Sequence, residues 1–101
     1  MKFDSEYSPN KQVGPAQYIT ELICKKRADS FKTELPIFFW RLSEWRLYFQ
    51  YQIVEANKLL KRYDCISIIQ ALNDKRSKTV FSLKNPILIK TIEFYEQKKG
   101  K

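Results

Sequence analysis

Three basic side chains, Lys58, Lys61 and Arg62, have the types and the spacing for a shared chemical role. Residues three and four positions apart lie side by side on a helix, so these three charges are predicted to share one face. Lysine and arginine neutralise phosphate, and a basic helix face is typical of proteins that bind the nucleic-acid backbone. A lysine-rich face is also often only hydrated. The spacing therefore indicates either a phosphate-binding surface or a solvated helix face.

A second basic cluster follows after one short predicted helix. It holds Lys75, Arg76 and Lys78, and Lys84 comes shortly after it. If the helices before this cluster fold back on each other, the two clusters lie about 15 Å apart, the length of one short helix. Such a surface would bridge several phosphates of one strand, and we expect all four residues to contact them.

Base contacts need other side chains. Lysine binds phosphate as a point charge, whereas base edges are read mainly by Arg, Asn or Gln. The candidates near the basic clusters are Arg62, Asn73 and Arg76. Tyr48 and Tyr51 are candidates for stacking, because single-stranded nucleic acid stacks its bases on aromatic rings between basic side chains. We expect phosphate contacts to dominate, with weak dependence on base sequence.

The charge of the chain is unevenly distributed. The net charge is +8 over 101 residues. Residues 1–55 hold eight basic and seven acidic side chains, whereas residues 56–101 hold eleven basic and four acidic ones. A basic half is the electrostatic feature expected of a protein that binds nucleic acid, more often DNA than RNA in this interpretation.

Composition argues against an enzyme. There is no histidine, so histidine triads and HExxH zinc sites are excluded. The glycines, Gly14 and Gly100, have no nucleotide-loop spacing. Cys24 and Cys65 lie on apolar stretches, which favours two buried thiols in a reducing compartment and leaves a single disulfide open. We therefore expect no catalytic residue, no cofactor and no metal site.

The sequence also predicts a protein without a membrane segment. The longest uninterrupted apolar run is residues 35–40, and a membrane span needs about twenty residues. No apolar segment follows Met1, so no signal peptide is expected and the predicted location is cytoplasmic. Fourteen lysines against five arginines indicate an AT-rich genome, such as that of a bacterium, a virus or a phage.

Helical spacing predicts an all-α single domain, a bundle of about four helices. Local signals mark where helices begin: Pro15 at a first helical position, Ser43 and Asp64 as N-caps, and Asn85-Pro86 as a cap and first residue. The expected helices span residues 15–30, 44–62, 65–74 and from 86 to about 97. Residues 73–78 are expected to form a polar connection, and residues 79–83 a short extended one.

The domain boundaries follow from the same pattern. Residues 1–14 are predicted to form an N-terminal arm, pinned to the body by Phe3 or Tyr7. The helical domain is expected to cover residues 15–97, with a basic tail at 98–101.

The second helix is predicted to bury one apolar stripe, and most aromatic side chains nearby are expected in the core. The stripe consists of Trp45, Phe49, Ile53, Ala56, Leu60 and Tyr63. Trp40 and Phe81 are expected to pack with it. The run Ile37–Trp40 either plugs one end of the core or forms an exposed interaction patch.

Residues 44–95 hold a characteristic order of segments. After Trp45, the segments are Ala56-Asn57-Lys58-Leu59-Leu60-Lys61-Arg62-Tyr63, Ile68-Ile69-Gln70-Ala71-Leu72-Asn73 and Phe81-Ser82-Leu83-Lys84-Asn85-Pro86-Ile87-Leu88. This order resembles a segment of phage replisome-organiser and helicase-loader proteins. The chain departs from the family pattern where a second tryptophan usually follows the third helix, since Phe81 stands near that place. The resemblance implies a role in replication, with contacts to a helicase and to DNA, often single-stranded.

These observations support two hypotheses. The first is a small, basic, non-enzymatic accessory protein that binds nucleic acid in phage or mobile-element replication or regulation, with a possible protein partner in a replication complex. The second is a protein–protein adaptor or inhibitor that docks on an acidic partner protein. Pairing of two copies through the second helix is compatible with both.

Overall fold

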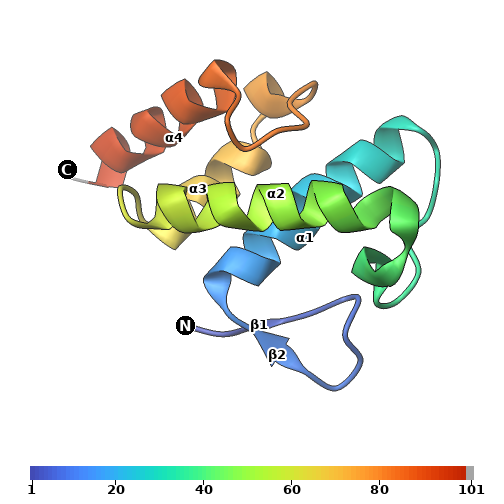
Figure 1. The fold of residues 1–101 in the computed structure, drawn as a ribbon. Coiled ribbons are helices and arrows are strands. Elements are labelled where there is room, and N and C mark those ends of the chain that lie inside the picture. The colour runs from blue at the N-terminus through green and yellow to red at the C-terminus, as the bar shows by residue number, and fades with distance from the viewer. Residues whose placement is uncertain (100–101) are drawn as a thin grey trace.

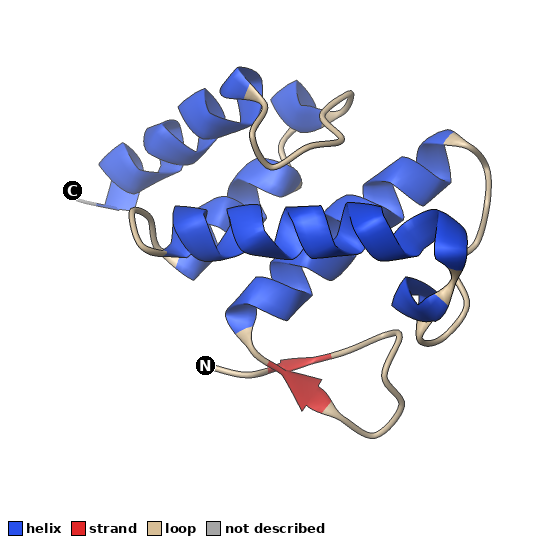
Figure 2. Cartoon of the chain, in the orientation of Figure 1, coloured by secondary structure: helices blue, strands red, loops and turns tan. Residues whose placement is uncertain are grey.

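Four α-helices carry most of the chain in the computed structural model, which describes residues 1–99 (Figure 1). The helices are α1 (Pro15–Ser30), α2 (Ser43–Leu60), α3 (Cys65–Leu72) and α4 (Pro86–Lys99), with two 3-10 helices, η1 (Phe39–Arg41) and η2 (Lys75–Ser77), and two strands, β1 (Phe3–Asp4) and β2 (Gln12–Val13). The two strands pair as one small antiparallel hairpin (Figure 2). The predicted all-α class, a single-domain bundle of about four helices, is confirmed.

The helices pack as two pairs, α1 against α2 and α3 against α4, and α3 also contacts α1. Every α-helix contributes buried apolar side chains to the shared core, and those of α2 are Trp45, Ala56 and Leu59. Both Cys24 and Cys65 are buried free thiols, as predicted. Burial raises the pKa of the Cys24 thiol to about 12. Within residues 1–99, no helix is both long and apolar enough to cross a membrane.

Local signals correctly placed three helix starts. Pro15 begins α1 after Gly14, because its fixed φ suits the first turn. Pro86 begins α4, and the Asn85 side-chain oxygen accepts a hydrogen bond from the Ile87 N–H at 2.9 Å. Asp64 occupies the N-cap position of α3, although its carboxylate bonds to Lys99 instead of the helix N-terminus.

The predicted cap of α2 is wrong. Leu42, with extended backbone, is the N-cap residue, and Ser43 is already the first residue of the helix. The Leu42 carbonyl accepts hydrogen bonds from the N–H groups of Trp45 and Arg46. Just before it, η1 holds the side chain of Phe39 in the core, so tertiary packing sets where α2 begins.

The predicted apolar stripe of α2 is only partly correct. Trp45 and Ala56 are buried, but Phe49, Ile53, Leu60 and Tyr63 are half-buried. The buried face instead includes two polar residues, Gln52 and Glu55. The Gln52 side-chain oxygen accepts a hydrogen bond from the Leu83 N–H at 2.9 Å, and Glu55 pairs with Lys58. These contacts stabilise a helix orientation that apolar spacing alone does not predict.

Two connections hold local structure that the prediction did not specify. The polar connection at 73–78 contains η2, whose N-cap Asp74 accepts a hydrogen bond from the Arg76 N–H. The connection at 79–83 lies between turns, in which the Val80 N–H donates to the Ser77 carbonyl and the Asn85 N–H donates to the Ser82 carbonyl. Val80 and Leu83 of this connection are buried in the core.

The apolar run at 37–40 is divided. Phe39 is fully buried and contacts the rings of Tyr7, Trp45 and Phe49 edge to face. Ile37 is 55% exposed, and Phe38 has a left-handed backbone with φ 53°. Phe39 therefore plugs the core, and Trp40, which is half-buried, packs against it.

The first fourteen residues fold against the helices. Tyr7 is buried, and the Phe3 ring stacks on Tyr18 with 4.3 Å between centroids. At the other end of the chain, Lys98 and Lys99 belong to α4, so helix replaces the first part of the predicted tail. Gly100 and Lys101 lie outside the described residues.

A buried carboxylate ties the hairpin region to α1. Glu21 is 3% exposed and accepts hydrogen bonds from Ser5 Oγ and from Gln17 Nε2. Burial nevertheless raises the pKa of Glu21, because the loss of water penalises its charged form more than these two donors stabilise it.

This raised pKa predicts a pH-dependent stability. Between the unfolded glutamate pKa, about 4.3, and the raised value, the folded state binds more protons than the unfolded state, so stability falls as pH rises. We expect the free energy of unfolding of the unmodified protein, relative to Glu21→Gln, to increase as the pH is lowered from 7 to the unfolded glutamate pKa of about 4.3. Urea denaturation of both proteins at the two pH values measures this. A difference that does not change with pH would contradict it.

Candidate nucleic-acid interface

The α2 basic end consists of Lys58, Lys61 and Arg62, which lie on and just after the last turn of α2. Lys58 pairs with Glu55 at 3.1 Å. Lys61 and Arg62 are exposed and have no acidic partner within residues 1–99. The negative end of the helix dipole favours cations here, so the helix itself stabilises this cluster.

The η2 basic turn consists of Lys75, Arg76 and Lys78, all exposed. Arg76 bonds to both carboxylate oxygens of Asp74, at 3.0 and 3.1 Å, and its guanidinium lies 4.4 Å from the centroid of the Phe94 ring. Because its guanidinium is bonded to Asp74, Arg76 is not free in this conformation to make the predicted base contact. Lys75 and Lys78 make no ion pair with any residue from 1 to 99.

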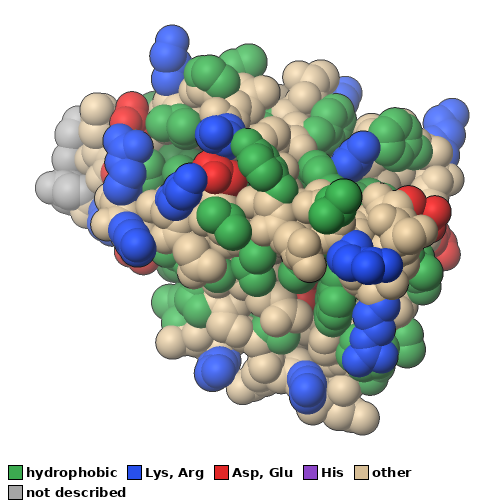
Figure 3. Space-filling model, in the orientation of Figure 1, with side chains coloured by type: hydrophobic (Ala, Val, Ile, Leu, Met, Phe, Trp, Pro, Cys, Tyr) green, Lys and Arg blue, Asp and Glu red, His purple; other side chains and the backbone are tan. Residues whose placement is uncertain are grey.

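The two basic clusters lie at opposite ends of α3 (Figure 1). This helix has eight residues, which corresponds to about 12 Å along its axis. Asn73 is exposed at its C-terminal end, directly before η2. Figure 3 shows that Lys and Arg side chains also gather on the visible face near the end of α2. The clusters therefore flank one short helix but do not merge into one patch.

The acidic residues of this half are engaged in the fold. Asp64 bonds to Lys99 at 2.9 Å, and Glu96 accepts hydrogen bonds from Ser67 and Lys99. Tyr63 donates to Glu93 at 2.8 Å. These bonds join α4 to the start of α3, and they lower the pKa of Asp64 mainly through Lys99 and that of Glu96 mainly through Ser67.

At the other end of α3, Asp74 has the corresponding role. It accepts hydrogen bonds from Arg76 and, at 2.6 Å, from the Tyr95 hydroxyl. Both hold the pKa of the Asp74 carboxyl well below its usual range. With the acidic side chains so engaged, seven basic side chains between residues 56 and 99 have no ion pair among the described residues. They are Lys61, Arg62, Lys75, Lys78, Lys84, Lys90 and Lys98.

The two candidate stacking residues have different surroundings. Tyr51 is 47% exposed, and the Lys84 Nζ lies 5.9 Å from its ring centroid. The Tyr48 hydroxyl instead donates to the Phe81 carbonyl, and the Arg27 guanidinium lies 4.3 Å from the Tyr48 ring centroid. Burial raises the pKa of Tyr48. In this conformation Tyr48 therefore packs within the fold, and its stacking on a base stays a prediction.

Sequence reasoning left out two unpaired lysines, Lys90 and Lys98. Both lie exposed on α4. In the sequence, neither lysine lies next to an Arg or Asn that could read a base. They become candidate phosphate contacts only because the structure shows them without an ion pair within residues 1–99.

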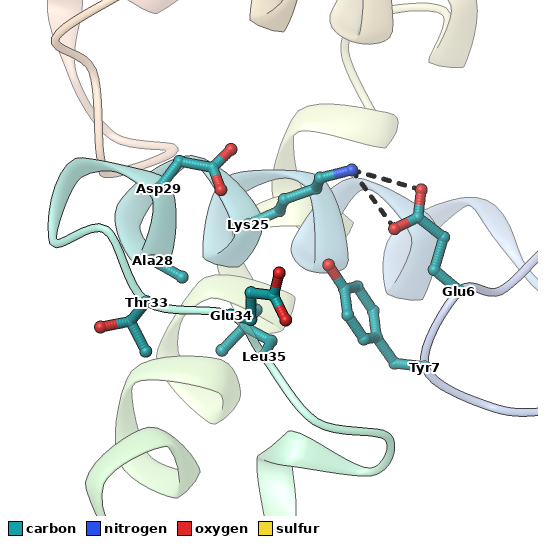
Figure 4. Close-up of a pocket in the computed structure, with 8 residues that line it drawn as sticks. All are labelled: Glu6, Tyr7, Lys25, Ala28, Asp29, Thr33, Glu34 and Leu35. Carbon is teal, nitrogen blue, oxygen red and sulfur yellow. Dashed lines mark hydrogen bonds and ion pairs between the residues drawn. The ribbon is translucent and has the colours of Figure 1, made fainter.

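A pocket on the other half of the molecule has the opposite charge. It lies between α1, the hairpin region and the segment after α1, and its lining includes Glu6, Asp29 and Glu34 (Figure 4). Lys25 pairs with Glu6 at 3.3 Å, and burial raises the pKa of Tyr7 to about 12. The carboxylates repel phosphate, so this pocket is not part of the candidate interface. Within residues 1–99, no group of three or more His, Cys, Asp or Glu side chains is placed to hold a metal ion.

A comparison of the chain with protein-family models, with curated proteins and with solved structures gives no match. The resemblance of residues 44–95 to phage replication proteins therefore stays a prediction. The candidate interface depends on the geometry and charge described above.

Proposed function

We propose that this protein is a small, non-enzymatic nucleic-acid-binding protein that contacts phosphates through the α2 basic end and the η2 basic turn. The observation that carries the proposal is the division of charge in its second half. The acidic side chains there bond to other parts of the fold, whereas seven basic side chains have no ion pair among residues 1–99. Such a surface attracts the phosphate backbone.

The proposed ligand is DNA rather than RNA, and the proposed context is phage or mobile-element replication or regulation. Both rest on the resemblance of residues 44–95 to phage replication proteins. Because lysine predominates over arginine and Arg76 is bound to Asp74, we expect affinity to depend weakly on base sequence. Tyr51 beside Lys84 offers one stacking position for a single strand.

The proposal predicts the effect of reversing three charges. The variant Arg62→Glu, Lys75→Glu, Lys78→Glu removes exposed cations that pair with no carboxylate among residues 1–99, so the described ion pairs stay intact. We expect its affinity for a labelled DNA oligonucleotide at low salt to fall by a factor of ten or more. Each lost phosphate contact should also reduce the steepness of the salt dependence by about 0.9 on duplex DNA. Fluorescence anisotropy measures both quantities.

A matched control separates position from total charge. The variant Lys2→Glu, Lys11→Glu, Lys32→Glu reverses three exposed charges in the first half of the chain. It is expected to retain most of the affinity. Equal losses in both variants would mean that net charge alone drives binding, and an unchanged affinity in the first variant would show that the site lies elsewhere. Circular dichroism checks that both variants keep their helix content.

A second candidate function is a protein–protein adaptor that docks on an acidic partner. The observation in its favour is Phe31, 63% exposed, with the Arg27 guanidinium 5.7 Å from its ring centroid. The run Ile37–Trp40 supports it less than expected, because Phe39 is buried. Absence of nucleic-acid binding, together with capture of an acidic protein that Phe31→Ala abolishes, would favour this alternative.

A further inference from the structure

The solvent side of α2 carries apolar residues that nothing in residues 1–99 covers. Leu47 is 75% exposed, Tyr51 47% and Val54 52%. Their spacing of four and three places them in one row, which we call the α2 stripe. Figure 3 shows hydrophobic side chains along α2 on this face. The buried face of the helix, with Trp45 and Ala56, points the other way into the core.

The stripe continues at both ends with charged residues of opposite sign. Glu44 lies three positions before Leu47, and Lys58 and Lys61 lie four and seven positions after Val54. The whole series advances in alternating steps of three and four, which is the spacing of a coiled-coil seam. Its N-terminal end is acidic, its centre is apolar and its C-terminal end is basic. Glu44 has no ion pair within residues 1–99.

We propose that the α2 stripe binds the α2 stripe of a second copy of this chain, with the two helices antiparallel across a two-fold axis. A two-fold interface uses the same surface on both subunits, so the surface must be complementary to itself. In the antiparallel register that sets Glu44 opposite Lys61, Tyr51 of one copy lies against Val54 of the other, and Leu47 lies against the aliphatic part of Lys58. Glu44 of each copy then lies opposite the basic end of the other, where Lys61 is unpaired.

The charges exclude the other arrangement and disfavour other occupants. A parallel pair would set Glu44 against its own copy, and Lys58 and Lys61 against theirs, which is repulsive at both ends. An acidic peptide or a phosphate backbone would match the basic end but would meet Glu44 at the other. A second copy, reversed in direction, matches both ends of the stripe.

The size of the stripe indicates a weak dimer. The eighteen residues of α2 span about 27 Å, and the exposed apolar residues occupy its centre. Interfaces below about 1,200 Å² in total are typically weak and transient. Sedimentation equilibrium of the unmodified protein alone, from about 1 µM to 1 mM, is therefore expected to show a reversible monomer–dimer equilibrium. A protein that stays monomeric over this range would overturn the proposal.

Substitutions in the stripe test which surface forms the dimer. Val54→Glu places a charge in the centre of the proposed interface and, at a position that is 52% exposed, leaves the core untouched. We expect it to weaken association by a factor of ten or more. Ile87→Glu is the matched control, because Ile87 is also an exposed aliphatic residue, 49% exposed, but lies on α4. A dimer that survives Val54→Glu, or that Ile87→Glu disrupts equally, would overturn the assignment.

Charge exchange tests the direction of the helices. Glu44→Lys and Lys61→Glu are each expected to weaken the dimer, because each places like charges opposite one another. The double variant restores opposite charges at both ends of an antiparallel pair, so association should recover. Failure of the double variant to recover would contradict the antiparallel arrangement. The dimer and the proposed nucleic-acid ligand would compete for Tyr51, Lys58 and Lys61, which belong to both surfaces. No nucleic acid is present in these measurements, so their outcome tests the dimer separately from the proposed function.

Discussion

Replacing Phe39 by alanine is expected to lower the free energy of unfolding by about 3–5 kcal/mol. Phe39 is fully buried, and its ring contacts those of Tyr7, Trp45 and Phe49, with centroids 5.0–5.8 Å apart. The truncation removes these contacts and leaves a cavity where η1, α2 and the N-terminal segment meet. Because small domains have a total stability of about 5–15 kcal/mol, the loss is a large fraction of it.

The control for this prediction is Ile37→Ala, two positions earlier in the same apolar run. Ile37 is 55% exposed, so its truncation should change the free energy of unfolding by no more than about 0.5 kcal/mol. Urea denaturation measures both variants, and helix content by circular dichroism reports the transition independently of the nearby tryptophans. Equal effects of the two substitutions would show that Phe39 is not the residue that plugs the core.

Replacing Gln52 by methionine is expected to cost about 1–3 kcal/mol of stability. Gln52 is 2% exposed, and its side-chain oxygen accepts the hydrogen bond of the Leu83 N–H. Methionine is similar in length, so packing is largely kept while the acceptor is removed, and the buried Leu83 N–H has no partner.

Gln50→Met is the matched control, because Gln50 lies on the same helix but is exposed. It should change stability by no more than about 0.5 kcal/mol. The two melting curves, recorded by circular dichroism, are compared directly. If Gln52→Met is as stable as Gln50→Met, the Gln52–Leu83 bond does not hold the 79–85 segment against α2.

The parts of the fold that the sequence predicts correctly depend on neighbouring residues. Pro15 and the pair Asn85-Pro86 start their helices through the backbone geometry of one or two residues, so α1 and α4 begin where predicted. The start of α2 depends instead on Phe39, which is held by rings from other segments. The prediction from residue preferences alone therefore placed the N-cap of α2 at Ser43, one residue after the observed N-cap, Leu42.

Long-range contacts explain the remaining differences. Gln52 is buried because its partner, Leu83, comes 31 residues later. Apolar spacing cannot detect a buried polar residue, so it assigned the core face of α2 partly to Ile53, which is half-buried. The turns around 79–83 likewise depend on distant contacts, because Val80 and Leu83 are buried and the Leu83 N–H bonds to Gln52.

The candidate interface shows the same limit. The basic clusters are contiguous in sequence, so their existence and exposure are predictable, and α3 sets their separation. The sequence does not show which of these basic side chains lack a partner. Arg76, for example, bonds to Asp74 and also packs on Phe94, which comes eighteen residues later in the chain. Likewise, helical spacing does not show that Tyr48 is packed within the fold while Tyr51 is exposed. The hydroxyl of Tyr48 bonds to a residue that lies 33 positions away in the chain.

The proposed nucleic-acid binding is tested most directly by a salt titration. Labelled single-stranded and double-stranded DNA, with RNA of the same sequence, would be titrated with the protein at low and near-physiological salt, and binding followed by fluorescence anisotropy. Phosphate contacts predict micromolar or tighter binding to DNA and a slope of log affinity against log salt of about −3 to −6. The preferred strand form would separate backbone binding of a duplex from stacking on Tyr51. No binding at low salt, where electrostatic attraction is strongest, would contradict the proposal.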